Sequence, residues 1–182
     1  MAMNDTQLKT WVEGFDSVLA DGQEAERKLF VMAVNVGASS AKQWEVLGVG
    51  VEDIALEYND DTETKTDILG VARTRVNKME PSQEFEPDTI RGGAVLQKKL
   101  DSIVARNAYS EFTQFEVMVC KLWLKNDDGY YAEVHSGCTI KPTSMGGSAY
   151  VDMPFSVSLS NKKTYGTVTD ITNITFTEAT VA

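Results

Sequence analysis

The stretch that most constrains this chain is residues 113–142, which reads TQFEVMVCKLWLKNDDGYYAEVHSGCTIKP. Apolar residues alternate on both sides of the turn-forming run 126–129, the pattern of two β-strands. We predict an antiparallel hairpin with a loop of two or four residues, because only an even loop brings both apolar sets to one face. The residues expected on that first face are Phe115, Val117, Val119, Trp123, Ala132, Val134, Cys138 and Ile140.

The opposite face of the first strand is apolar as well. It carries Met118, Cys120, Leu122 and Leu124. A sheet with one side in water has no need of apolar residues on that side. We therefore expect the second face to be covered, either by a helix of this chain or by another copy of the protein.

Two segments show helical periodicity. Residues 5–26 carry apolar side chains at three- and four-residue steps, with Asn4 or Asp5 as a cap and Gly22 as a stop. Residues 94–106 form a second stripe that could cover the second face of the hairpin. Lys98, Lys99 and Arg106 lie on its polar side.

The other segments alternate with period two, which indicates strands at 28–36, 44–50, 52–58, 67–79, 151–159, 164–171 and 174–177. Between two of them, residues 59–66 read NDDTETKT and have no apolar residue. We predict a solvated loop there, since the acids lack the spacing of a calcium-binding loop. Together these segments predict a mainly β, α+β fold.

The composition excludes some classes of function. The 182 residues suit one domain, and a formal charge of −10 argues against tight phosphate binding, although many acidic chains are acidic only for solubility. Cys120 and Cys138 are expected on opposite faces of the hairpin, so a disulfide between them is not predicted. No apolar run is long enough to span a membrane, and no secretion signal is apparent.

Few residues suit catalysis. His135 is the only histidine, which argues against triads and zinc sites. It is expected on the face of Cys120, and in one register directly opposite it, where a cysteine–histidine pair could activate a thiol. Both would lie in mid-strand without a third group, so we expect no enzyme. Three tryptophans could be sugar platforms but fit a core better: Trp11, Trp44 and Trp123.

Two parts of the chain resemble the phage tail tube (major tail protein) family. The first is WEVLGVGVEDIALEYNDDTETKTDILG followed by VNKMEPSQEFEPD. The second is YYAEVHSGCTIKPTSMGGSAYVDMPFSVSLSNKKTYGTVTD, which is similar to the closing hairpin, Ser-x-Gly-Gly turn and Pro-Phe strand of that family. The resemblance covers roughly residues 28–177, and the helical segment before it departs from the pattern.

The resemblance implies a two-sheet, barrel-like β-sandwich with a flanking helix, formed by residues 28–182 and preceded by a helical extension, residues 1–27. It implies six copies per ring, stacked rings, and a channel that conducts DNA into the host without binding it. Tape measure, tail terminator and distal tail proteins are the implied partners, and the virion tail, assembled in host cytoplasm, is the implied location. No cofactor, metal or membrane insertion is expected.

Within this reading, the polar segment is expected to be mobile in the free subunit and to order against a neighbouring ring. Its residues are Tyr58, Asn59, Asp60, Asp61, Thr62, Glu63, Thr64, Lys65, Thr66 and Asp67. Acidic side chains are expected to outnumber basic ones on the channel wall. The alternative is a monomeric β-sandwich that binds carbohydrate or mediates adhesion.

Overall fold

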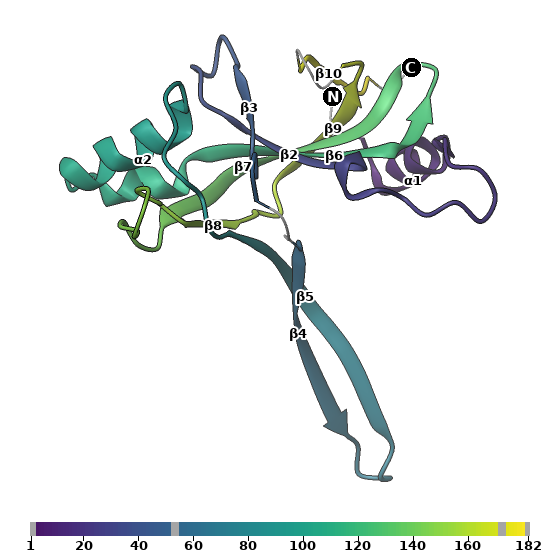
Figure 1. Cartoon of the computed structure of the whole chain (residues 1–182). Coiled ribbons are helices and arrows are strands. Elements are labelled where there is room, and N and C mark those ends of the chain that lie inside the picture. Colours follow the sequence, from purple (N-terminus) through teal and green to yellow (C-terminus); the bar gives the residue numbers. More distant parts are fainter. Residues whose placement is uncertain (1–2, 52–54, 171–173, 181–182) are drawn as a thin grey trace.

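The computed structural model describes residues 3–51, 55–170 and 174–180. All ten strands in the described residues belong to one large antiparallel sheet, flanked by two α-helices (Figure 1), so the mainly β prediction is confirmed. The elements are α1 (Asp5–Glu13), β1 (Asp16–Ser17), η1 (Arg27–Leu29), β2 (Phe30–Asn35), β3 (Trp44–Val46), β4 (Glu57–Thr66), β5 (Ala72–Phe85), α2 (Val95–Ala105), η2 (Tyr109–Thr113), β6 (Phe115–Asn126), β7 (Gly129–Pro142), β8 (Phe155–Ser158), β9 (Lys163–Val168) and β10 (Phe176–Glu178).

The sheet branches at β7. Its main path runs β3-β2-β6-β7-β8-β5-β4. Strand β6 pairs with one edge of β7, while the other edge is shared: residues 130–135 pair with β9 and residues 139–142 pair with β8. Because β8 and β9 follow one another in the chain, they act as one strand interrupted at residues 159–162. Strand β10 extends the β9 branch.

The predicted hairpin of β6 and β7 is confirmed, with a two-residue turn between Asn126 and Gly129. The Asn126 side-chain oxygen accepts hydrogen bonds from the backbone N–H groups of Asp128 and Gly129, both at 3.0 Å. The predicted faces are partly wrong, because the register shifts between Lys121 and Lys125. The bulge leaves residues 122–124 without partners on β7, and this odd number exchanges the faces.

Each face of the hairpin therefore carries a different set of side chains from the predicted set. Ala132 and Val134 lie on the second face, since they pair with Cys120 and Met118. Cys138 and Ile140 return to the first face, as predicted. They do so because Gly137 is an extra residue on β7, between the pairs made by Phe115 and Glu116 on β6. Trp123 falls in the bulge, and its ring lies 6.3 Å from that of Phe30.

The bulge at Gly137 provides a test of this register. Gly137 has φ of 77°, and the nearest atom to an added Cβ is 4.0 Å away, so space is not limiting. We expect Gly137→Ala to lower the free energy of unfolding by about 1–2 kcal/mol, the cost of left-handed backbone. Gly137→Asn should cost less, because asparagine tolerates this conformation. Urea unfolding measures both, and an alanine variant as stable as wild type would contradict the bulge.

Helix α2 covers the first face of the hairpin. Three of its side chains, Leu96, Leu100 and Ile103, are at most 2% exposed and pack in the main core with Val117 and Val119. The helix itself is confirmed, but its predicted place over the second face is wrong. Met118, Cys120 and Leu122 of the second face are instead buried within the chain, in a cluster that also contains Ala33, Val168 and the partly buried Ile174 and Phe176.

Helix α1 is shorter than predicted. Asn4 caps it, as expected, and shares a capping box with Gln7. The helix ends at Glu13 with Gly14 as its C-cap residue, and the chain then joins the sheet as β1. The division between an extension, residues 1–27, and a domain, residues 28–182, stays a prediction. In the described part of the chain, no helix has the length and apolar content needed to cross a membrane.

Candidate assembly surface

The β4–β5 hairpin extends away from the rest of the molecule as a two-stranded ribbon (Figure 1). All of β4 and residues 72–80 of β5 are exposed. Only the last residues of β5 enter the body, where residues 82–85 pair with β8 and bury Phe85. The prediction of a loop at residues 59–66 is therefore wrong. Each of these residues pairs with β5, and this pairing outweighs the low strand propensity of the Asn, Asp, Glu and Lys residues among them.

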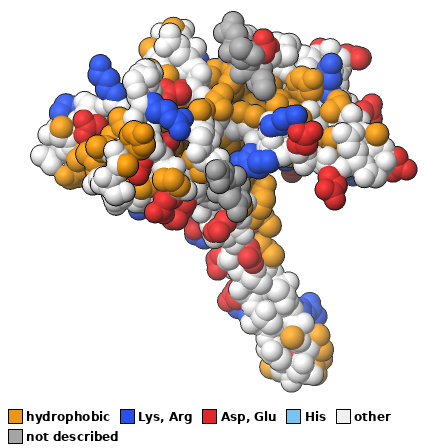
Figure 2. Space-filling model, viewed as in Figure 1, with side chains coloured by type: hydrophobic (Ala, Val, Ile, Leu, Met, Phe, Trp, Pro, Cys, Tyr) orange, Lys and Arg blue, Asp and Glu red, His pale blue; other side chains and the backbone are white. Residues whose placement is uncertain are grey.

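The tip of the ribbon is a tight, apolar turn. The Asp67 carboxylate accepts hydrogen bonds from the N–H groups of Leu69 and Val71, at 2.9 and 3.0 Å. The turn holds Ile68 and Leu69 outward, 103% and 83% exposed. Figure 2 shows this hydrophobic patch at the far end of the ribbon. Two large apolar side chains at such a position lose water only when another molecule covers them.

The two faces of the ribbon differ in composition. Directly opposed residues share a face, so the register assigns each side chain. One face, here called the threonine face, consists of Tyr58, Asp60, Thr62, Thr64, Thr66, Ala72, Thr74, Val76, Met79 and Pro81. The other, here called the charged face, consists of Asn59, Asp61, Glu63, Lys65, Arg73, Arg75, Lys78 and Glu80.

Side-chain contacts agree with this assignment. On the threonine face, Thr62 donates to Asp60, and the hydroxyls of Thr64 and Thr74 lie 3.0 Å apart. A bulge maintains the face: Asn77 is the extra residue between Val76 and Lys78. Without it, Val76 and Met79 would point to opposite sides, since they are three residues apart.

The charged face is largely self-compensated. Asp61 lies opposite Lys78, and Glu63 lies opposite Arg75. Lys78 also contacts Glu80 at 2.6 Å, and this hydrogen bond raises the pKa of Lys78. Exposed pairs of this kind contribute little stability. They keep the face hydrated and close to neutral.

A polar network lies beside the root of the ribbon. Tyr58 and Pro81 border a hollow of about 290 Å³ whose other walls include Leu8 and Val12 of α1 and the side chain of Glu133. The hollow thus connects three parts of the chain that are distant in sequence: the terminal helix, the ribbon and the central strand β7.

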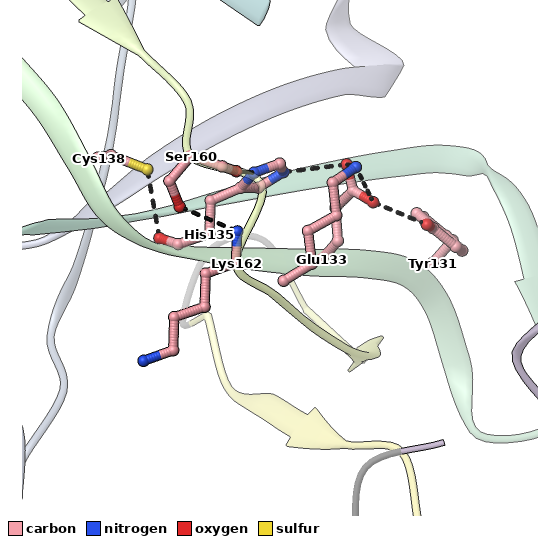
Figure 3. A network of polar contacts seen from close by, with 7 residues as sticks. Tyr131, Glu133, His135, Cys138, Ser160 and Lys162 are labelled. Atoms are coloured by element: carbon pink, nitrogen blue, oxygen red, sulfur yellow. Dashed lines mark hydrogen bonds and ion pairs between the residues drawn. The ribbon is translucent and has the colours of Figure 1, made fainter. Parts of the chain in front are cut away.

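Glu133 is the centre of this network (Figure 3). Its carboxylate accepts from Tyr131 Oη at 2.9 Å and contacts Lys163 Nζ at 3.2 and 3.3 Å. His135 Nε2 lies 3.1 Å from the carboxylate, and His135 Nδ1 lies 2.6 Å from the Ser160 carbonyl. Burial favours the neutral acid, but the His135 hydrogen bond and the Lys163 charge outweigh it and lower the pKa of Glu133 to about 2.

The cysteine–histidine hypothesis is wrong in its geometry. Cys120 pairs with Ala132, whereas His135 pairs with Val117, so the two side chains point to opposite faces of the sheet. Burial raises the pKa of the Cys120 thiol to about 12, which disfavours the reactive thiolate. Cys138 is buried on the first face and Cys120 on the second, so the prediction that they point to opposite faces is confirmed.

The tryptophans are partly buried in the described structure. Trp11 packs its ring against Phe15 and Tyr131, with centroids 4.8 and 5.6 Å apart. Trp44 borders the cluster of the second face. With Trp123 in contact with Phe30, all three serve packing, as their positions in apolar stripes predicted.

Sequence reasoning missed the ribbon and the Glu133 network. A signal for the ribbon was present: Thr62, Thr64 and Thr66 alternate with charged residues, which is a period-two pattern without large apolar side chains. No local signal marks the network, because Lys163 and Ser160 reach Glu133 and His135 only through the branching of the sheet.

No protein-family model matches the sequence, and no curated protein matches it. Among solved structures, the chain is similar to one from the sheath–tube complex of the PVC extracellular contractile injection system in its extended state. The sequence identity is 11%, the match covers 92% of this chain and 100% of the other, and the TM-score is 0.48. It is also similar to one from the tube-terminating cap of the anti-feeding prophage, with 13% identity, 84% and 96% coverage and a TM-score of 0.47.

Proposed function

We propose that this chain is a structural subunit of a bacteriophage tail tube, in which six copies form a ring and rings stack around a channel. The observation that carries the proposal is the exposed β4–β5 ribbon with its apolar tip. An isolated two-stranded hairpin is only marginally stable in water, and long exposed strands tend to pair with other chains. Contact with a neighbouring copy would stabilise the ribbon and would give its exposed strands a partner.

In the proposed assembly the ribbon joins one ring to the next. The segment from Tyr58 to Asp67, which is one strand of the ribbon with the start of its turn, then provides the inter-ring contact. The ribbon and the surface that receives it are different, so the contact is heterologous and propagates instead of closing between two copies. Tape measure, tail terminator and distal tail proteins are the proposed partners at the ends of the tube.

The channel of the proposed tube conducts DNA. The formal charge of −10 per chain supports this part, because an acidic wall repels a polyanion and a basic wall would retain it through counterion release. We expect Lys98, Lys99 and Arg106, which are exposed on and beside α2, to lie away from the channel. This role requires neither an active site nor a cofactor.

Microscopy of the purified full-length chain tests the proposal. Fresh, concentrated and aged samples should be compared by size-exclusion chromatography and electron microscopy, since tube growth can require an initiator. We expect hollow tubes or rings with six subunits per layer and an acidic lumen wide enough for a duplex of roughly 20 Å. A strict monomer in every sample, with no tube of this chain in the parent particle, would refute the proposal and favour a binding module.

A further inference from the structure

The ribbon has two faces of different chemistry, and only one of them suits a buried contact. The threonine face has a single charged residue, Asp60, whereas all but one of the residues on the charged face are ionisable. Tyr58, Val76 and Met79 on the threonine face are 58%, 51% and 49% exposed. Burying that face removes apolar area and short hydroxyl side chains from water. Burying the other would desolvate many charges.

We infer that the threonine face of the ribbon docks onto a second copy of this chain, while the charged face stays in water. The inference rests on the proposed function and specifies its contact. Charge supports a second copy as the occupant: a nearly neutral face can lie on a chain of formal charge −10 without strong repulsion. The charged face already compensates its own charges through the opposed pairs Asp61–Lys78 and Glu63–Arg75.

The size of the face indicates how the copies assemble. Ten paired residues in each strand extend roughly 33 Å, and two strands are about 10 Å wide, so one face offers roughly 300 Å². A stable pair of proteins buries about 800 Å² on each partner. One docked ribbon is therefore too small to hold a dimer. A contact repeated between two rings meets this need, because every copy gives one ribbon to the next ring and receives one.

Figure 2 shows hydrophobic side chains on one side of the ribbon where it meets the body of the molecule. The threonine face is continuous with the interior there: Leu56, two residues before Tyr58, packs against the main core, and Pro81 lies opposite Tyr58. The body's own elements do not reach the outer part of this face, since residues 57–66 and 72–80 are all exposed. Its cover must come from another chain.

Thiol labelling of adjacent residues on opposite faces tests the inference. The variants are Thr64→Cys on the threonine face and Glu63→Cys on the charged face, both exposed in the free chain. The native thiols of Cys120 and Cys138 are 0% exposed, so the dye should not label them. A maleimide dye should label both variants quickly as monomers. In assembled tubes, labelling of Thr64→Cys should slow by at least about tenfold, while Glu63→Cys stays within about threefold.

A second pair of variants adds the same charge to each face. Thr64→Lys should prevent tube growth, because it places a charge in the contact, whereas Glu80→Gln, which makes the charged face one unit more positive, should permit it. Tubes in which Glu63→Cys is protected and Thr64→Cys reacts freely, or in which both thiols behave alike, would overturn the inference and leave the tube intact. A wild-type chain that never assembles would instead overturn the proposed function, and the inference with it.

Discussion

A chain with a shortened ribbon is expected to fold normally and to form no tubes. Replacing residues 60–79 by Asn-Gly retains the opposed pair Asn59–Glu80 and closes it with a two-residue turn. The removed residues are exposed except for the partly buried turn residue Asp67, and none belongs to a core cluster, so little packing is lost. We expect the unfolding temperature by circular dichroism to stay within about 4 °C, since exposed changes rarely exceed about 0.5–1 kcal/mol.

Electron microscopy of concentrated samples then measures tube length. The shortened chain should neither nucleate tubes nor extend seeds of wild-type protein, because it has no ribbon to give to the next ring. A full-length variant, Ile68→Ser with Leu69→Ser, separates the tip from the rest of the ribbon and should weaken growth less. Tubes of normal length from the shortened chain would show that the ribbon is a passive extension.

Substitution of Glu133 is expected to have the largest effect on stability. Glu133 is 8% exposed and accepts hydrogen bonds from Tyr131, with His135 and Lys163 also within contact distance. Glu133→Gln removes the negative charge and leaves Lys163 without its buried partner. We expect a loss of about 3 kcal/mol at neutral pH, the lower end for a broken buried pair. This corresponds to a fall of roughly 6–12 °C in unfolding temperature.

The effect depends on pH in a defined direction. The pKa of Glu133 falls from 4.5 to about 2 on folding, so the stabilisation is complete above pH 4.5 and is lost as the pH falls toward 2. Urea unfolding of wild type and Glu133→Gln should therefore converge in acid. Glu24→Gln, at an exposed carboxylate, is the matched control and should follow wild type throughout. A difference that is equally large at pH 2 and pH 7 would mean that packing, and not charge, accounts for it.

Local pattern determined much of the fold. The alternation in residues 113–142 predicted the β6–β7 hairpin and its apolar second face, and the stripe in residues 94–106 predicted α2. The sequence also predicted Asn4 as one of two candidate caps of α1, and Asn4 is the cap. These features depend on residues within one or two helical turns, or on two strands joined by one tight loop. Their physical causes, helical and strand periodicity and turn chemistry, are therefore contained in the local sequence.

Tertiary structure decided what depends on distant partners. Five of the eight residues 59–66 have low strand propensity, and the segment forms β4 because β5 supplies its hydrogen-bond partners. The bulges at residues 122–124 and at Gly137 set which side chains share a face, and an extra residue leaves no mark in an alternating pattern. Glu133 acquires its low pKa from the His135 hydrogen bond and the Lys163 charge, and Lys163 reaches it only because β9 pairs with β7. Pairing between distant strands, not local preference, placed both the ribbon and the network.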